Sequence, residues 1–339
     1  MEKNGSDVTS NANTRTKVPL ITRIRQSYVF GRFELVGLAI ALVALGTVFT
    51  LLSPYFMTSG NLKALGVAIS LTAILAAAQT VVIISGSIDL SFASVLALSG
   101  IAAQKILTLG APLPIIIVGA LLVGVACGLI NAAICVAGRV NPLIATIGTG
   151  FAFRGLAFIW LGYETLPYFD STSLNFIANG RIYGIPFPVI LCITVIMGIW
   201  ILLQFTSFGS RVYAVGGSEI AARLAGVSVS RLRVKIFVLS GLSGAVGGLL
   251  LTSLNGNAFP DAGTGDELRV IAAVILGGTA LMGGRGSVIG TALGVLILGV
   301  LANGMNLLGV SPFWQVFFSG VILILAVVVD EQRRQAEQR

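Results

Sequence analysis

The stretch ALGVAISLTAILAAAQTVVIISG, residues 64–86, decides the fold of this chain because it is long, apolar and free of charge. A helix of about 20 apolar residues is long enough to cross the hydrocarbon core of a bilayer. Runs of this kind recur along most of the 339 residues, of which 56% are hydrophobic and only 10% charged. A soluble domain carries about 25% charged residues, so this chain has too little polar surface to cover a water-facing globule. The sequence predicts an all-α polytopic membrane protein within a lipid bilayer.

Apolar windows divide the chain into about ten predicted transmembrane helices. They lie roughly at 34–53, 64–86, 88–109, 113–138, 142–163, 186–206, 236–256, 269–283, 287–307 and 312–330. Together they form one predicted transmembrane domain, residues 34–330, in which residues 207–235 form a cytoplasmic loop. Residues 1–33 are polar and basic and predict a flexible cytoplasmic tail, because no convincing signal-peptide cleavage site follows the first run. Residues 331–339 predict a short cytoplasmic tail at the C-terminus.

Basic residues mark the cytoplasmic side of this arrangement. Sixteen of the 21 Lys and Arg fall in segments that are cytoplasmic when the N-terminus is inside. The other five lie outside or within the spans and are Lys63, Lys105, Arg154, Arg181 and Arg269. This bias follows the positive-inside rule, and an even number of spans places both termini in the cytoplasm. Because the basic residues gather at the ends of apolar runs, the net charge of +8 indicates orientation and not a nucleic-acid partner.

Sequence motifs for catalysis are missing. The chain has no G-x-x-x-x-G-K-[ST] phosphate loop, no G-x-S-x-G elbow and no H-E-x-x-H pair. It has no histidine, and its three cysteines lie inside apolar windows, which predicts packing residues rather than a disulfide framework. The glycine-rich GGTALMGGRGS, residues 277–287, lacks the Lys-Ser/Thr of a phosphate cradle and predicts a close-packed turn. We therefore expect no catalytic residue, no metal and no cofactor bound by this chain.

Glycine makes up 42 residues, about 12% against a usual ~7%. Two sets recur at regular spacing, Gly241, Gly244 and Gly247, and Gly286, Gly290 and Gly294. Small residues at such spacing let helix backbones approach closely in a membrane, so they predict a tightly packed bundle. The windows 142–163 and 269–283 combine polar residues or glycine with an apolar background. Each is either an interrupted or re-entrant helix that lines a path, or an ordinary helix kinked by glycine.

A charged stretch, SEIAARLAGVSVSRLRVK at residues 218–235, interrupts the apolar runs on the cytoplasmic side. Ser218 is suited to cap a short helix and Gly226 to end it. Glu219 and Arg223 stand four residues apart in the favourable acid-first order. Such a helix is either a solvated loop stiffened by charge or the surface that a soluble cytoplasmic partner binds.

Residues 219–226, EIAARLAG, resemble the Glu-Ala-Ala…Gly coupling motif in the permease subunits of binding-protein-dependent ABC importers. Three further stretches resemble the branch of that family that imports ribose and other monosaccharides. They are SGSIDLS at 85–91, AGTGDELRVIAAVILGGTALMGGRGSVIGT at 262–291 and NGMNLLGVSPFWQ at 303–315. The likeness covers most of residues 35–330, and the long stretch is more specific than the short motifs. The same broad family includes branched-chain amino acid permeases, so a shared fold does not fix the substrate.

The resemblance implies a transmembrane subunit that forms the path for a monosaccharide across a bacterial inner membrane. This monosaccharide is a ribose-like pentose, a hexose or a related compound. Its implied partners are a cytoplasmic ABC ATPase that binds ATP and Mg²⁺, an extracytoplasmic sugar-binding protein, and a second copy or a sister permease. Glu219, Ala222, Arg223 and Gly226 would form the helix that docks on the ATPase. ATP binding would move this helix and tilt the bundle between inward and outward openings, so this chain needs two packing arrangements and no reactive group.

Polar residues within or beside the spans are the candidates for the path, namely Gln79, Asp89, Asn131, Arg154, Asn303 and Asn306. For the amides, hydrogen bonding between helices is the alternative role. Asp89 either has a functional role or favours the start of the following helix. Arg154 either pairs with carbonyl groups of an interrupted helix or borders the path. On the outer side, Asp266, Glu267 and Arg269 are candidates for docking the binding protein, although exposed loop acids often have no such role.

Two departures from the family pattern leave the sugar and the partner open. The branch usually continues Val-Gly where Phe92 and Ala93 stand, and an acidic residue is common where Arg269 stands. The alternatives are a permease for another small solute such as branched-chain amino acids, and an ion-coupled secondary transporter. A secondary transporter needs acidic or histidine groups deep in the spans, and only Asp89 is a candidate. A membrane enzyme would need a reactive group, and no such set of residues is present.

Overall fold

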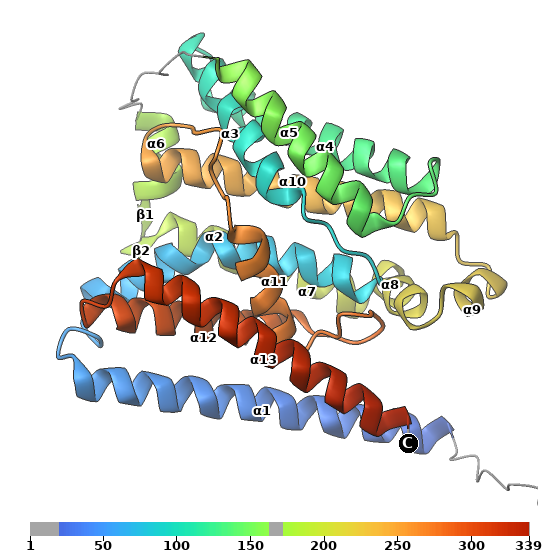
Figure 1. Ribbon diagram of the computed structural model, residues 1–339. Helices are drawn as coiled ribbons and strands as arrows, with labels where there is room; N and C mark the ends of the chain where they lie inside the picture. Colours follow the sequence, from blue (N-terminus) through green and yellow to red (C-terminus); the bar gives the residue numbers. More distant parts are fainter. Residues whose placement is uncertain (1–19, 163–171, 339) are drawn as a thin grey trace, which may run out of the picture.

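Helices dominate the computed structural model, which describes residues 20–162 and 172–338 (Figure 1). The helices are α1 (Leu20–Leu52), α2 (Ser59–Ile84), α3 (Phe92–Thr108), α4 (Leu113–Val136), α5 (Pro142–Leu161), α6 (Thr172–Asn179), α7 (Phe187–Phe205), α8 (Ser207–Gly217), α9 (Glu219–Leu224), α10 (Val229–Asn255), α11 (Asp266–Leu276), α12 (Val288–Leu307) and α13 (Pro312–Gln338). Two short strands, β1 (Arg181–Ile182) and β2 (Ile185–Pro186), pair antiparallel in a hairpin. The predicted all-α class is confirmed.

Seven helices in the described part of the chain are long and apolar enough to cross a membrane. They are α1 over its part Leu35–Leu52, α2, α4, α5, α7, α10 and α12, and they correspond to seven of the predicted spans. Helix α3, with 17 residues, and the Pro312–Ile322 part of α13 are shorter apolar helices. The protein is therefore a polytopic helical membrane protein.

Two predicted spans are shorter in the structure. Helix α3 begins at Phe92 and not at 88, because Gly86 adopts a left-handed φ of 76° and Asp89 bonds the backbone N–H of Ser91. Helix α11 ends at Leu276, where a glycine-rich segment follows. The helix thus covers only part of the predicted window 269–283, for which an interrupted or re-entrant helix was one of the two interpretations. With 11 residues, α11 is about 16 Å long, roughly half the ~30 Å hydrocarbon core.

The window 142–163 contains one uninterrupted helix, α5. Asn141 caps it by accepting a hydrogen bond from the N–H of Leu143 at 2.9 Å. Pro142 occupies the first helical position, where an N–H is not needed for a helical bond. The structure has one continuous helix here, so the interpretation of this window as an interrupted helix is wrong.

The first and last helices extend into the predicted tails. Helix α1 begins at Leu20, directly after Pro19, and no later proline interrupts it before Leu52. Helix α13 continues to Gln338. Residues 20–33 and 331–338 are thus helical, whereas 1–33 was expected to be flexible. Residues 1–19, the rest of that predicted tail, lie outside the described residues.

The helices pack as two groups that meet along α2 (Figure 1). Helices α3, α4, α5 and α10 form one group, and α1, α11, α12 and α13 form the other. Helix α2 packs against α10, α11 and α12, and α7 covers its side. Helices α8 and α9 lie at one end of the long axis, and α6 with the hairpin lies at the opposite end (Figure 1). Any partners that bind these two ends therefore approach from opposite sides.

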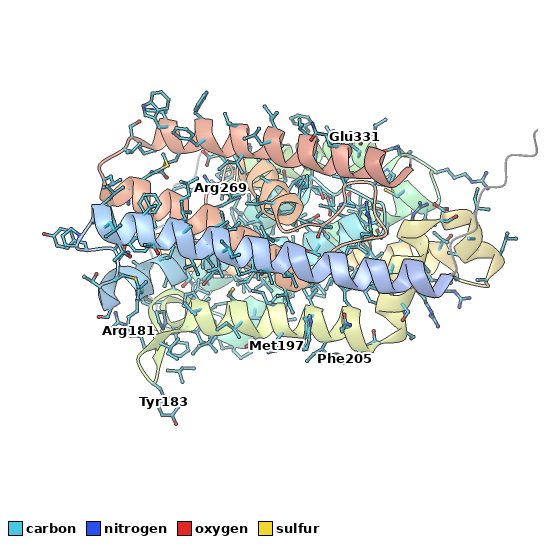
Figure 2. The ribbon with its side chains drawn as sticks, turned by 90° about the horizontal axis from the view of Figure 1, so that it is seen from below. Arg181, Tyr183, Met197, Phe205, Arg269 and Glu331 are labelled. Atoms are coloured by element: carbon cyan, nitrogen blue, oxygen red, sulfur yellow. The ribbon has the colours of Figure 1, made fainter. Side chains whose placement is uncertain are left out.

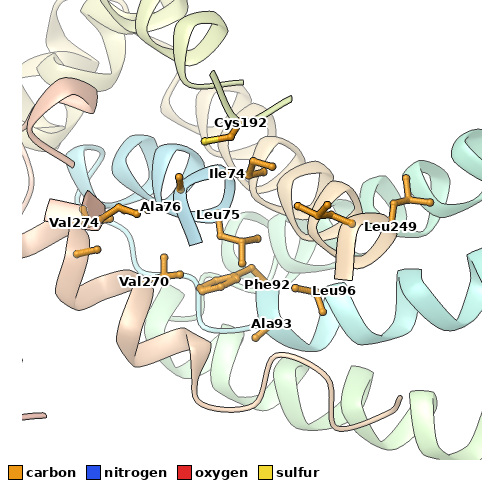
Figure 3. Packing of buried hydrophobic residues seen from close by; sticks show 14 of the residues in the cluster. Ile74, Leu75, Ala76, Phe92, Ala93, Leu96, Cys192, Leu249, Val270 and Val274 are labelled. Atoms are coloured by element: carbon orange, nitrogen blue, oxygen red, sulfur yellow. The ribbon is translucent and has the colours of Figure 1, made fainter. Parts of the chain in front are cut away.

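Aliphatic side chains fill the space between the two groups (Figure 3). Phe92, the first residue of α3, is fully buried and lies near Leu75, Leu96 and Val270, which come from α2, α3 and α11 (Figure 3). The Phe that departs from the family pattern is thus a core residue. On the outside, Met197 and Phe205 of α7 point away from the bundle (Figure 2). Apolar side chains on this face suit contact with lipid.

Glycines bring the helix backbones into contact, as their spacing predicts. Gly241 of α10 faces the carbonyl of Gly124 on α4, and Gly294 of α12 faces the carbonyl of Ala273 on α11. A Cβ atom at either glycine would collide with backbone. Within a membrane, where lipid is as apolar as the side chains, such close contact is a main source of helix association. Gly286 departs from the pattern, since it lies in the loop before α12 with a φ of 155°.

Candidate functional site

Helix α9 has the local structure that its sequence predicts. The hydroxyl of Ser218 accepts a hydrogen bond from the N–H of Ala221 at 3.2 Å and so caps the helix. The helix ends at Leu224, and Gly226 follows with a left-handed φ of 83°. Each end of α9 is thus set by its own sequence.

Glu219 binds two arginines of this chain. Its Oε1 accepts from Arg223 Nη2 at 2.6 Å within α9, and its Oε2 accepts from Arg233 Nη2 on α10, also at 2.6 Å. The hydrogen bond from Arg223 is the main cause that holds the pKa of Glu219 below its usual range. The carboxylate therefore fixes the orientation of α9 on α10. Ala222, on the buried face of α9, packs against the rest of the protein.

Two large apolar side chains project from α9 into solvent. Ile220 is 75% exposed and Leu224 is 86% exposed, and they stand four residues apart on one face of the helix. Helix α9 has six residues and is not among the helices long enough to cross a membrane. An exposed apolar pair on a rigid helix is a surface suited to a protein partner.

A buried polar network surrounds the break between α2 and α3. Asp89 Oδ1 accepts from the N–H of Ser91 at 2.8 Å and from its hydroxyl at 2.7 Å, and Asp89 Oδ2 accepts from Ser240 of α10 at 2.6 Å. Gln79 of α2 donates to the Ser240 hydroxyl at 2.8 Å, and Asn131 of α4 donates to the Ser91 hydroxyl at 2.7 Å. The network therefore joins α2, α4 and α10 around one carboxylate.

The network extends to α5 through two threonines. Thr149 donates to Asn131 Oδ1 at 2.5 Å, and the Thr146 hydroxyl donates to the carbonyl of Ile88 at 3.2 Å while accepting from the N–H of Leu90 at 3.2 Å. Three of the predicted path residues, Gln79, Asp89 and Asn131, are thus brought together and are at most 1% exposed. They hold helices together, which is the alternative role stated for the amides, and contact with cargo stays a prediction.

Arg154 follows Thr149 by five residues on α5 and holds the loop that enters α11. Its Nη1 donates to the carbonyl of Pro260 at 2.8 Å and to that of Ala262 at 2.6 Å, and its Nη2 lies 3.7 Å from Glu267 Oε1. Its carbonyl partners are therefore those of a connecting loop and not those of an interrupted helix. The guanidinium joins α5 to the start of α11.

The predicted docking residues are already engaged within the chain. Glu267 accepts from the N–H of Gly265 at 2.8 Å and pairs with Arg154, and Asp266 pairs with Arg269 at 3.4 Å. Arg269 remains half exposed, whereas Asp266 is mostly covered. Their contact with a binding protein stays a prediction, with Arg269 as the most accessible of the three.

The two remaining path candidates lie at the end of α12 away from α9. Asn303 and Asn61 of α2 form a reciprocal amide pair, with donor–acceptor distances of 3.0 and 2.9 Å. Asn306 is exposed and is the last residue but one of α12. Asn303 thus joins α12 to α2, and neither residue lies beside Asp89.

Sequence reasoning missed several residues of these sites, including Ser91, Ser240, Thr146, Thr149 and Arg233. The four hydroxyl residues are small and common in membrane helices, so their type alone carries no signal. Arg233 follows Glu219 by 14 residues, a separation with no helical meaning until the turn after α9 is known. Among the described residues, no three His, Cys, Asp or Glu side chains gather as a metal site would require.

Comparison with known proteins finds relatives over most of the chain. Residues 61–327 match the family model described as "Branched-chain amino acid transport system / permease component". The chain is 38% identical to the ribose import permease protein RbsC of Escherichia coli strain K12 over 298 residues, 87% of this chain and 93% of the relative. It is 37% identical to RbsC of Bacillus subtilis strain 168, over 93% of this chain and 98% of the relative.

A third relative carries another sugar in its name. The L-arabinose transport system permease protein AraH of Escherichia coli strain K12 is 38% identical over 328 residues, 93% of this chain and 96% of the relative. No solved structure matches the chain. The resemblance inferred from EIAARLAG and from the long stretch at 262–291 is confirmed. Since the family model and these relatives cover nearly the whole length, the chain belongs to the family of transport-system permease components that the model describes.

Proposed function

We propose that the chain is the membrane subunit of an ATP-driven importer and forms the path for a monosaccharide. The observation that carries this proposal is its 37–38% identity, across nearly the full length, to permeases named for ribose and L-arabinose. The alternative of a branched-chain amino acid rests on the broader family description alone. The protein is a multi-pass inner-membrane protein, and the substrate is a pentose or a related sugar.

The ATPase binds α9 in this proposal. The exposed Ile220 and Leu224 offer it an apolar surface, while Glu219 and Arg233 fix the angle at which α9 is presented. ATP and Mg²⁺ bind to the ATPase and not to this chain. Movement of the ATPase subunits then reaches the bundle through α9, so transport needs no reactive group here.

The membrane topology follows from the placement of α9. With α9 in the cytoplasm, the opposite end of the molecule, with α6 and the hairpin, faces outside, and the sugar-binding protein docks there (Figure 1). Counting the short α3, the half-length α11 and α13 with the seven longer helices, ten segments enter the membrane and both termini are cytoplasmic. A second copy or a sister permease completes the path. The tyrosine at the hairpin tip, Tyr183, is fully exposed on this outer side (Figure 2).

The path itself runs beside the buried network, with the neutral amides as its candidate contacts. Neutral hydrogen-bonding groups suit a sugar, since they bind without holding the cargo too tightly to leave. The short helix α11 is relevant to the path. A helix of half the membrane thickness occurs at membrane depth only where protein or a water-filled cavity covers its ends. Helix α11 is therefore the element that we place closest to the path.

Reconstitution tests this function. The chain is placed in proteoliposomes with its ATPase and its binding protein, and uptake of radiolabelled ribose, L-arabinose and leucine is measured with ATP and with a non-hydrolysable analogue. We expect uptake of one of the two sugars with ATP and no uptake with the analogue. Uptake of leucine instead would support the amino acid alternative. Sugar uptake driven by an ion gradient without the ATPase would contradict the proposal.

A further inference from the structure

Three segments that are distant in the sequence meet at the end of the bundle next to α9. They are Ile84–Gly86 at the end of α2, Gly216 in the last turn of α8, and Gly283–Gly286 in the loop between α11 and α12. We call these three segments the glycine junction. Neither the coupling motif nor the candidate path residues include any residue of it.

Backbone contacts hold the glycine junction together. The N–H of Gly284 donates to the carbonyl of Ile84 at 2.8 Å. Gly216 lies so close to both that a Cβ atom there would collide with the Ile84 carbonyl oxygen and the Gly284 nitrogen. Gly284 itself has a left-handed φ of 78° and would meet Gly217 backbone at 3.0 Å if it carried a Cβ atom. No side chain separates the segments, so a shift of one displaces the others.

One side chain reinforces this contact. The hydroxyl of Tyr213, one turn before Gly216 on α8, donates to the carbonyl of Gly286 at 3.0 Å, and Tyr213 is partly buried. Helix α8 is thus attached to the loop both by its backbone and by a hydrogen bond. This hydrogen bond offers a way to weaken the junction without adding volume.

The glycine junction connects α9 to both short helices. Helix α8 continues through Ser218 directly into α9. The end of α2 continues through Gly86 into the break that holds Asp89 and starts α3, and the loop at Gly284 follows α11. Atoms of the junction therefore lie between the proposed ATPase surface and the two elements nearest the proposed path.

From this geometry we propose that the glycine junction transmits the movement of α9 to the α2–α3 break and to α11, with Gly216 and Tyr213 as its positioning residues. The inference rests on the proposed function, since it requires that α9 is driven by an ATPase. Because packed backbones have discrete arrangements, the junction moves as a unit and does not absorb the displacement of α8. A loosened junction lets the ATPase cycle while the path stays closed.

The test compares Gly216→Ala with Gly217→Ala in the complete complex of permease, ATPase and binding protein in proteoliposomes. Gly217 is the matched control because it is the next residue, and a Cβ atom there meets nothing within 4 Å. The readout is the ratio of radiolabelled ribose or L-arabinose imported to ATP hydrolysed. We expect Gly216→Ala to lower this ratio by about ten-fold or more through strain at the junction, with the ATPase still bound and active, and Gly217→Ala to keep it.

Tyr213→Phe keeps the test decisive if Gly216→Ala fails to insert. It removes only the hydroxyl that binds Gly286, and we expect the ratio to fall by about three- to ten-fold, as suits one lost hydrogen bond. A purely structural role would lower the amount of complex and leave the ratio unchanged. A normal ratio in either inserted variant, or an equal loss in Gly217→Ala, overturns the inference. If the wild-type complex imports neither sugar with ATP, the proposed function fails first, and the two failures are thereby distinguished.

Discussion

Glu219 of α9 and Arg233 of α10 are joined across a turn by a contact of 2.6 Å, and the same carboxylate also holds Arg223. A glutamate in a motif that resembles a coupling motif is expected to reach a partner. Here both carboxylate oxygens are bound within the chain. In the proposed importer, the residue would act on the ATPase through the angle of α9, while the exposed Ile220 and Leu224 would offer the contact.

Arg233→Gln should release α9 from α10 and lower ATP-dependent uptake, while the protein still inserts in the membrane. The amide is neutral and shorter than the guanidinium, so it cannot replace the ion pair. Uptake and recovery of the ATPase with the purified permease measure the effect. Arg231→Gln is the matched control, because Arg231 is exposed on the same helix and makes no ion pair with a described residue. Equal uptake by the two variants would count against the positioning role of Glu219.

Leu224→Asp should weaken binding of the ATPase without a change in fold. Leu224 is 86% exposed, so no core contact is lost, but a charge replaces half of the apolar pair. Co-purification of the ATPase measures the effect, with Tyr183→Asp at the opposite end as control, since Tyr183 is also fully exposed. Retention of the ATPase by Leu224→Asp would show that the partner binds elsewhere.

The attachment of α9 should depend on pH only in the acid range. Because the pKa of Glu219 is lowered in the folded protein, its ion pairs contribute fully above its ordinary value of 4.5 and are lost as the pH falls through the folded value. A spin label at the exposed Ala225 should therefore have constant mobility near neutral pH and become more mobile well below pH 4.5. The Glu219→Gln protein should be mobile throughout. Glu219 stays ionised at roughly pH 6–8, because its pKa is lowered. A change in wild-type mobility within this neutral range would therefore assign the attachment to another group.

Asp89→Ala should destabilise the protein strongly. The change leaves the N–H and hydroxyl of Ser91 and the hydroxyl of Ser240 without their shared acceptor in a site that is 1% exposed. Each buried donor without a partner costs about 1–3 kcal/mol, so the total is about 3 kcal/mol or more. Thermal unfolding in detergent measures it, and Asp261→Ala, on an exposed loop, should change stability by less than about 0.5 kcal/mol. Similar midpoints for both variants would show that the network adds no stability.

Sequence alone predicts those features that depend on local spacing. The long apolar runs gave the seven long helices, the order Ser218–Glu219–Arg223–Gly226 gave α9, and the glycine spacing gave the contact of Gly241 with α4. These features follow from helix periodicity, capping and side-chain size. Each can be evaluated within a few turns of one helix.

Sequence could not predict the features that depend on three-dimensional contact. The break before Phe92 is stabilised by Ser240, which follows 151 residues after Asp89. The window 269–283 is apolar enough to span, yet α11 ends at Leu276 where Gly277 packs against Gly290 of α12. In each case the partner of the deciding residue lies on another helix, so hydropathy along one window contains no trace of it.

Arg154→Met should free the loop between α10 and α11. The methionine keeps much of the apolar stem but loses the bonds to Pro260 and Ala262, each a charge-assisted hydrogen bond worth about 1.5–3 kcal/mol. Hydrogen exchange of residues 257–265 should rise, and the unfolding midpoint should fall. Arg269→Met is the control, because its half-exposed pair with Asp266 is worth at most about 1 kcal/mol. Unchanged exchange in the loop would mean that the backbone turns at Pro260 and Gly263 hold it without Arg154. In that case Arg154 does not link α5 to α11, and a displacement of α11 would reach α5 through α3, which packs against both.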